Sequence, residues 1–208
     1  MMKIKLICLA LIFMTCSALL HADRLQDSYN KMLATYAKVN SWQAAITQSN
    51  YFAQSQSTLK SSGTFYFQRG KVAIYYTKPQ VQYLLVTDGK VTIYDQAARS
   101  AMRSGLLSSV QSLNPVEIVK TYWNASQKSL VQSVQGTTAI LLKPKSDKQI
   151  KEITVTLQNS TGYVKKLSYR DISGNTVSLS FTSGKVNQAI PKKIWNLPIP
   201  KSVKVLEY

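Results

Sequence analysis

The sequence has few of the residues that most enzyme and metal sites need. It has two cysteines and one histidine in 208 residues, at Cys8, Cys16 and His21. All three lie close to the amino terminus, where the sequence resembles an export signal. Lys3 and Lys5 form its basic start, and the apolar run that follows is shorter than a comfortable membrane-spanning helix.

We expect residues 1–22 to be a signal peptide cleaved after Ala22, which leaves residues 23–208 as a single domain. Cleavage after Ala18 is a second possibility. Lipidation of Cys16 is a third, although Thr15 is bulky for the position before a lipidated cysteine. Cleavage after Ala22 removes every cysteine and histidine. It therefore excludes serine–histidine triads, cysteine nucleophiles, zinc thiolate sites and disulfides.

Acidic residues are also scarce, and they are scattered. There are nine Asp and Glu against 26 Lys and Arg, so the formal net charge is +17, or 17 − 2 = +15 without Lys3 and Lys5. Asp88 and Asp171 fall in turns, and Gly89-Lys90 lacks the glycine spacing of a phosphate loop. We therefore expect no catalytic site, no metal and no cofactor.

The positive charge has three possible meanings. It is either a solvated surface, a surface attracted to an anionic membrane or acidic partner, or a nucleic-acid surface. The sequence shows no known nucleic-acid motif, and an exported protein rarely meets nucleic acid, so we expect no nucleic-acid partner.

What the sequence does have is a block of strands at residues 63–95, GTFYFQRGKVAIYYTKPQVQYLLVTDGKVTIYD. Four alternating or apolar runs are separated by Arg69-Gly70, Lys78-Pro79 and Asp88-Gly89, which are turn sequences. Linkers this short predict an antiparallel meander. Bulky residues fall on both faces, so both must be covered, or one must hold an apolar ligand.

Helical spacing of apolar residues predicts a helix over residues 23–39 and another that starts at Asn114-Pro115. Residues 98–112 are typical of a weak helix or an ordered loop. We expect strands at residues 41–57, a polar turn at residues 56–62, and further strands from residue 130 to the C-terminus, roughly ten in all. The predicted fold is mainly β (α+β): an open antiparallel β-barrel covered by a lid of two or three helices.

Several segments together resemble the LolA family of periplasmic lipoprotein carriers. They are VNSWQAAITQ at residues 39–48, GTFYFQR at 63–69, LVTDGK at 85–90 followed by Tyr94-Asp95, and DISGN at 171–175 followed by Asn187, Ile190, Trp195 and Pro200. The sequence departs from the family pattern at Gly70, where the family has proline, and at Tyr75 or Tyr76, where it has tryptophan.

The resemblance implies an open barrel and a helical lid that enclose a cavity for lipoprotein acyl chains, with Arg69 as the latch of the lid. We predict that the cavity is lined by Trp42, Ile46, Phe65, Phe67, Val72, Ile74, Tyr76 and Leu85, and that the lid contributes Leu106, Leu107, Val110 and Val119.

The function that this implies is a soluble periplasmic chaperone, not an enzyme, that carries lipoproteins from the inner to the outer membrane. Its expected partners are acylated lipoproteins, the inner-membrane lipoprotein-releasing ABC transporter and, if present, an outer-membrane acceptor lipoprotein. We expect a monomer. The alternative is a LolA-like carrier or sensor of another lipid, such as a glycolipid or phospholipid.

Overall fold

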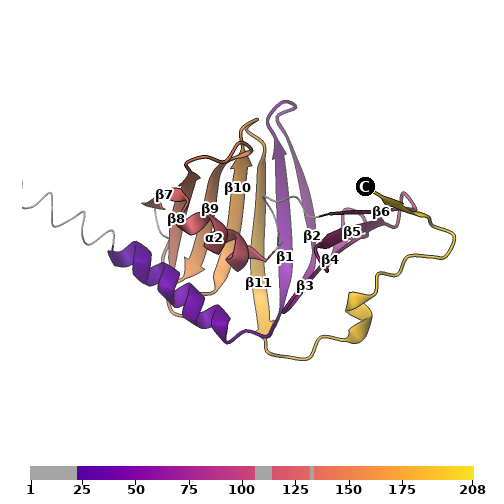
Figure 1. The fold of residues 1–208 in the computed structure, drawn as a ribbon, viewed down its shortest axis with the longest axis horizontal. Coiled ribbons are helices and arrows are strands. Elements are labelled where there is room, and N and C mark those ends of the chain that lie inside the picture. Colours follow the sequence, from indigo (N-terminus) through magenta and orange to yellow (C-terminus); the bar gives the residue numbers. More distant parts are fainter. Residues whose placement is uncertain (1–22, 106–113, 132–133) are drawn as a thin grey trace, which may run out of the picture.

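The computed structural model describes residues 23–105, 114–131 and 134–208. Within these ranges the chain forms one curved, unclosed sheet of twelve strands in the order β12-β6-β5-β4-β3-β2-β1-β11-β10-β9-β8-β7 (Figure 1). All neighbouring strands are antiparallel except β12 and β6, which are parallel. The strands are β1 Ser41–Phe52, β2 Ser57–Gln68, β3 Lys71–Lys78, β4 Gln82–Thr87, β5 Lys90–Asp95, β6 Ser100–Gly105, β7 Ser126–Val131, β8 Thr137–Pro144, β9 Ile150–Gln158, β10 Val164–Asp171, β11 Thr176–Val186 and β12 Val205–Glu207.

Two α-helices cover one face of this sheet, which we call the inner face. The N-terminal helix spans residues 23–37, and α2 spans Pro115–Trp123. The predicted apolar stripe of the N-terminal helix packs inward through Tyr29, Met32 and Tyr36. Between sheet and helices lies the main core, in which Met32, Phe65 and Ile46 are at most 2% exposed. The fold class predicted from the sequence is confirmed.

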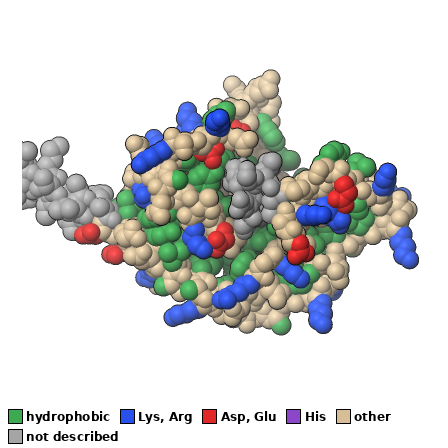
Figure 2. Space-filling view, viewed as in Figure 1, with side chains coloured by type: hydrophobic (Ala, Val, Ile, Leu, Met, Phe, Trp, Pro, Cys, Tyr) green, Lys and Arg blue, Asp and Glu red, His purple; other side chains and the backbone are tan. Residues whose placement is uncertain are grey.

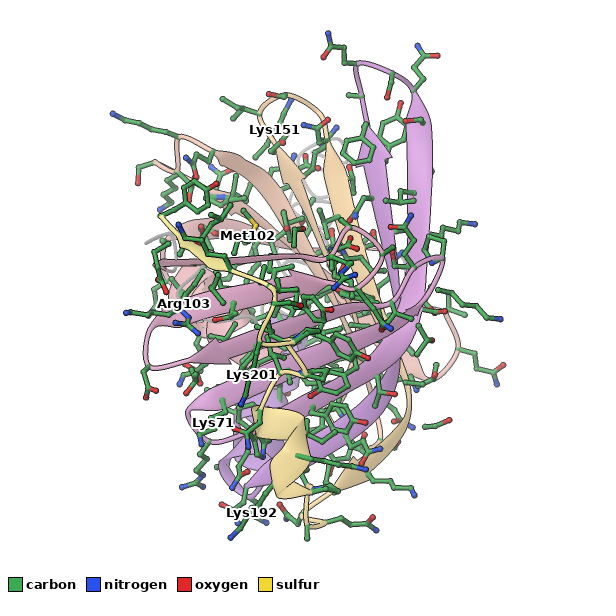
Figure 3. The ribbon with its side chains drawn as sticks, turned by 90° about the vertical axis from the view of Figure 1, so that its right-hand side faces the viewer. Lys71, Met102, Arg103, Lys151, Lys192 and Lys201 are labelled. Carbon is green, nitrogen blue, oxygen red and sulfur yellow. The ribbon has the colours of Figure 1, made fainter. Side chains whose placement is uncertain are left out.

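The opposite face of the sheet, the outer face, carries a row of tyrosines. Tyr66, Tyr75, Tyr83 and Tyr94 lie on consecutive strands, with neighbouring ring centroids 4.7–6.0 Å apart. The C-terminal segment, residues 187–204, crosses this row and includes the 3₁₀-helix η2, Lys192–Trp195 (Figure 3). The Tyr75 hydroxyl donates to the carbonyl oxygen of Ile194 over 2.9 Å. The two faces therefore have separate covers.

Three segments differ from the sequence-based expectation. Residues 57–62, expected in a turn, belong to β2, because the β1–β2 pairing continues to Phe52 and Ser57. Residues 100–105, expected in a helix or loop, form strand β6, where Ala101 packs with Tyr94 and Val203 on the outer face. The first helix ends at residue 37, not 39. Strand pairing here outweighs local composition.

Two contacts hold α2 in place. The Tyr122 hydroxyl donates to Asp147 Oδ2 over 2.6 Å, and the Trp123 ring stacks on Tyr29 of the N-terminal helix at 3.9 Å. Desolvation acts to raise the pKa of Asp147, but hydrogen bonds from Tyr122 and from the backbone of Ile150 and Gln149 outweigh it and lower the pKa. The charged carboxylate is therefore the form that holds the helix.

Gly63 is required where β2 meets β3. A Cβ at this position would lie 2.0 Å from the carbonyl oxygen of Tyr75, beside a register shift between the two strands. We expect Gly63→Ala to lower the free energy of unfolding by about 3 kcal/mol, because the backbone of β3 must move. Gly105→Ala is the control, since a Cβ there meets no atom of the described residues within 4 Å. Equal urea midpoints for the two variants would show that the close approach is absent.

The Tyr122–Asp147 bond predicts a pH-dependent effect. Tyr122→Phe should lower the unfolding free energy by about 1 kcal/mol at neutral pH, and the pKa of Asp147 should rise in the variant. A lowered carboxyl pKa stabilises the fold above the unfolded-state value of 3.8, and this stabilisation is lost as the pH falls below it.

Unfolding curves between pH 2 and 7 test this, with the exposed Tyr51→Phe as the control. The difference between wild type and Tyr122→Phe should shrink below pH 3.8. A difference that is constant across the range would mean that Asp147 does not accept this bond.

Candidate functional site: an apolar cavity between sheet and helices

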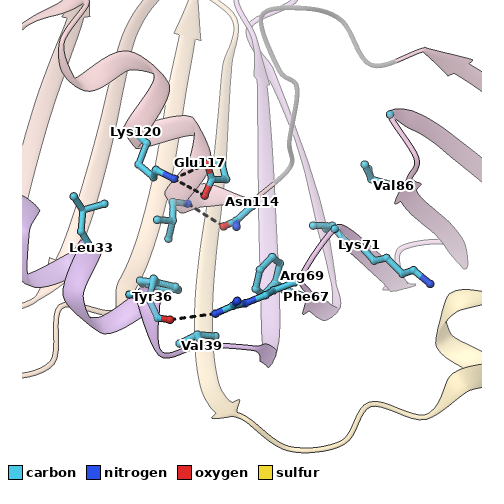
Figure 4. A pocket seen from close by; sticks show the side chains of 15 residues that line it. Leu33, Tyr36, Val39, Phe67, Arg69, Lys71, Val86, Asn114, Glu117 and Lys120 are labelled. Atoms are coloured by element: carbon cyan, nitrogen blue, oxygen red, sulfur yellow. Dashed lines mark hydrogen bonds and ion pairs between the residues drawn. The ribbon is translucent and has the colours of Figure 1, made fainter.

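A cavity of about 530 Å³ opens where the N-terminal helix, the β2–β3 turn and the start of α2 meet (Figure 4). Its size is within the range of roughly 300–1,000 Å³ that is usual for ligand pockets. It is lined by Leu33, Tyr36, Ala37, Val39, Phe67, Arg69, Gly70, Lys71, Val72, Val86, Gly89, Asn114, Val116, Glu117 and Lys120.

Apolar side chains from three neighbouring strands form the wall on the sheet side. Phe67 is paired with Val72, and Val72 is paired with Val86, so all three point to the inner face. Leu33 and Val116 approach from the two helices. The alternation of β2, β3 and β4 thus produces a continuous apolar surface that these helices do not fill.

Polar and charged groups lie at the rim. Glu117 and Lys120 form an ion pair of 3.0 Å on α2, and the Asn114 side chain caps that helix by accepting from the backbone N–H of Val116 over 3.1 Å. Arg69 lies across the opening at the β2–β3 turn, whereas the side chain of Lys71, which precedes the inward-facing Val72, points away from the cavity. The opening therefore combines an apolar interior with a net positive rim.

Arg69 joins the sheet to the N-terminal helix. Its Nη2 donates to the carbonyl oxygen of Ala37 over 3.2 Å, and its backbone N–H donates to Asn40. The carbonyl groups at a helix C-terminus lack partners within the helix, so a cation is favourable there. The resemblance implies that Arg69 latches the lid. In the structure, the Arg69 side chain contacts the C-terminal end of the N-terminal helix.

The N-terminal helix has further bonds to the sheet side. The Tyr36 hydroxyl accepts from the backbone N–H of Val164, and Thr35 donates to the carbonyl oxygen of Thr161 over 2.6 Å. Burial raises the pKa of Tyr36 well above its ordinary value, although the Val164 bond opposes this. Tyr36 is therefore neutral at physiological pH and acts in the cavity wall as a partly apolar surface.

The predicted site residues lie at the rim of the cavity, in its wall, or in the core behind it. Phe67 and Val72 line the cavity, and Arg69 lies at its rim. Further residues lie in the core that continues from it: Trp42, Ile46, Phe65, Ile74, Tyr76 and, on α2, Val119. Leu106, Leu107 and Val110 lie outside the described residues.

Leu85 is a correction. It lies on the outer face, packed with Ala73 and Ile194. Both faces of β4 are apolar, so composition does not show which residues point inward. Five residues separate the paired Tyr76 and Gln82, so the length of the turn does not show it either. The β4 residue on the inner face is its neighbour, Val86.

Sequence reasoning also missed the apolar lining residues that lie on or beside the two helices. Leu33, Tyr36 and Val39 were recognised as the apolar stripe of a helix, and Val116 as part of a helix side, but none was assigned to the cavity. The apolar stripe of each helix could have indicated these residues, because the apolar side of a helix that covers an open sheet faces the space between helix and sheet. What was missing was the placement of the helix end beside the β2–β3 turn.

The lining of the cavity suits non-covalent binding of an apolar ligand. Among the described residues, no group of three or more histidine, cysteine or acidic side chains has the arrangement of a metal site. Within the same residues, no helix has the length and hydropathy needed to cross a membrane. The cavity itself combines apolar walls with cations, an arrangement suited to an apolar chain that ends in a polar or anionic group.

Comparisons with known proteins agree with this geometry. Residues 37–197 match the family model described as outer membrane lipoprotein carrier protein LolA. The outer-membrane lipoprotein carrier protein of Cupriavidus taiwanensis is 30% identical over 153 residues, which are 71% of this chain and 71% of the relative. The corresponding protein of Cupriavidus pinatubonensis is 29% identical over 178 residues, 81% of this chain and 82% of the relative.

Among solved structures, an uncharacterized conserved protein from Thermus thermophilus aligns with a TM-score of 0.57 at 11% identity, covering 89% of this chain and 99% of that one. At this identity the alignment shows the fold alone. The family match covers most of the chain, so this chain belongs to the LolA family.

Proposed function

We propose that this protein is a periplasmic carrier that holds the acyl chains of lipoproteins in the cavity and takes them from the inner to the outer membrane. Two of the relatives reported above carry the name outer-membrane lipoprotein carrier protein. The observation that supports the proposal most directly is the apolar cavity of about 530 Å³ between sheet and helices.

Burial of acyl chains supplies the affinity. Each CH₂ group moved from water to an apolar site contributes about 0.8 kcal/mol. Lipoproteins with several acyl chains stay firmly in a membrane, so a carrier must offer them an apolar surface of comparable extent. The main core continues directly from Phe67 and Val72, so outward movement of the helices would enlarge the surface available to a chain.

Release requires that closure of the empty cavity compete with binding. In a two-state carrier, any contact that stabilises the closed empty form lowers the apparent affinity for cargo. The Arg69–Ala37 bond is such a contact, because it joins the β2–β3 turn to a helix that covers the cavity. We assign to Arg69 the role of a latch.

The proposed route requires two protein partners that handle lipoproteins at the membranes. They are an inner-membrane lipoprotein-releasing ABC transporter, which loads the carrier, and an outer-membrane acceptor lipoprotein where one exists. The carrier itself performs no covalent chemistry and needs no cofactor.

A second candidate is a carrier or sensor of an anionic phospholipid or glycolipid. The rim favours it, because Lys120 is paired with Glu117 and Arg69 adds a positive charge at the opening. An anionic headgroup would lie beside Arg69 while its chains occupy the apolar interior.

Filling the cavity tests the proposal. Val86→Phe places added carbon atoms in the space that a chain would use, and we expect it to weaken binding of a fluorescent fatty acid about tenfold, the loss of burial for about two CH₂ groups. The matched control is Val131→Phe, on the exposed edge strand β7. Equal affinity of both variants and wild type, with unchanged thermal unfolding, would show that the probe binds elsewhere.

The latch has its own test. Arg69→Leu removes a charge-assisted hydrogen bond worth about 1 kcal/mol. We expect the apparent affinity for the fluorescent fatty acid to rise by up to about fivefold, because more of the empty protein is open. Lys166→Leu, which removes an exposed cation from the middle of β10, is the control. An affinity that falls, or that stays at the wild-type value, would contradict a latch at Arg69.

A further inference from the structure

An exposed apolar cluster lies at the end of the sheet remote from the cavity. The β1–β2 hairpin projects past the neighbouring strands (Figure 1) and carries Tyr51, Phe52 and Leu59, which are 39%, 43% and 48% exposed. Ile172, in the β10–β11 turn, is 67% exposed. We call these four residues the apolar tip. The cavity lies at the other end of the hairpin, where Ser41 pairs with Gln68.

The members of the apolar tip come from adjacent segments. Leu59 is paired with Asn50, so Leu59 and Phe52 are diagonal neighbours on the same face of the hairpin. The turn that carries Ile172 is joined to the hairpin, because the backbone N–H of Ala53 donates to Asn175 Oδ1 over 3.1 Å. Phe52 and Leu59 therefore lie on one face of the protruding hairpin, Tyr51 lies on its opposite face, and Ile172 lies in the adjacent turn.

The hairpin carries no charged residue from β1 through its turn to Leu59. Residues 40–59 contain no Asp, Glu, Lys or Arg, although these residues make up 17% of the chain. A surface without charges loses little hydration free energy when it enters an apolar medium, whereas a single charge would make entry costly.

Four lysines lie beside this uncharged surface. Lys60 follows Leu59 on β2, and the β8–β9 region contributes Lys145, Lys148 and Lys151, all exposed. A backbone bond from Ile172 to Gln149 joins the β8–β9 turn to the apolar tip. We call these four residues the lysine rim. Basic side chains border the protruding hairpin in the space-filling view (Figure 2), and Lys151 is labelled near that end in Figure 3.

The acidic groups of this end are bonded elsewhere. Asp147 accepts from Tyr122 and from two backbone N–H groups, Asp171 accepts from Asn175, and Glu152 is paired with Arg170 at 2.6 Å. Within the described ranges, no carboxylate lies within ion-pair distance of the lysine rim. Asp147 and Asp171 keep their negative charge, but the four lysines and Arg170 outnumber these three carboxylates, so the net charge of this end is positive.

We propose that the apolar tip and the lysine rim together form a docking surface for an anionic lipid bilayer. Aromatic and aliphatic side chains enter the headgroup region, where tyrosine and other amphipathic rings are favourable. The lysines remain at the surface, where each gains free energy from the negative potential of anionic lipids. The inference does not depend on the cargo, since the cavity lies at the other end of the hairpin.

Vesicle co-sedimentation of the purified protein tests this proposal. Wild type should bind vesicles of phosphatidylethanolamine and phosphatidylglycerol and should not bind phosphatidylcholine vesicles. The double variant Phe52→Ser/Leu59→Ser should bind at least tenfold more weakly. Its control is Met102→Ser/Leu206→Ser, a paired position on β6 and β12 with almost the same exposure, 44% and 46%.

The electrostatic part has a separate readout. Lys145→Gln/Lys148→Gln/Lys151→Gln should weaken binding and reduce its dependence on salt, because fewer counterions are exchanged when the protein binds. Thermal unfolding and fatty-acid binding of all variants should match wild type. This separates the docking surface from the cavity, because a failed cavity proposal would leave vesicle binding intact.

Three results would overturn the proposal. In the first, wild type does not bind anionic vesicles. In the second, the Phe52/Leu59 and Met102/Leu206 double variants lose binding equally. In the third, the Phe52/Leu59 variant binds vesicles normally but no longer delivers cargo through a protein acceptor, which would make the apolar tip a protein-docking surface.

Discussion

The structure depends on the need to cover a single sheet that is apolar on both faces around β3 and β4. A strand buried on only one face alternates apolar and polar residues, but β3 and β4 carry bulky apolar groups on each side. The C-terminal segment covers the tyrosine row of the outer face. On the inner face the described cover is two helices, one of only nine residues, and the space between them and the β2–β3 turn is the cavity.

This arrangement separates rigid from adjustable contacts. The N-terminal helix is bonded to the far part of the sheet through Thr35 and Tyr36, while Arg69 provides its bond to the β2–β3 turn. The cavity lies between these two attachments. Loss of the Arg69 bond leaves the first attachment in place, so the opening can change while the helix stays on the sheet. A carrier needs this property, because it must bind and release without unfolding.

The main outline of the fold follows from local signals. The turns at Arg69-Gly70 and Asp88-Gly89 and the helix start at Asn114-Pro115 are where the sequence places them. The resemblance to the LolA family implies a latch at Arg69, and in the structure Arg69 bonds to Ala37 of the N-terminal helix. Composition favoured a helix or loop at residues 98–112, because the contacts of Ala101 with Val203 and Val205 come from the distant C-terminal segment.

The cavity was less predictable than the fold. Phe67 and Val72 were identified and line the cavity, whereas Leu85 was misplaced because β4 is apolar on both faces. Val39 and Val116 approach the cavity only through the placement of two helices on the sheet. The long hairpin and its exposed apolar tip were also missed, because the polar residues around Gln56 are typical of a turn and the strand pairing continues almost to it.

The central claim is that the cavity holds acyl chains. The most direct test is native mass spectrometry of the protein isolated from the periplasm of its own cells. The account predicts an added mass that equals an acylated lipoprotein and that is lost from Val86→Phe. A free phospholipid or glycolipid would select the second candidate. A protein that carries no added mass and also ignores a fluorescent fatty acid would contradict the account, and the inner face would then be an ordinary core.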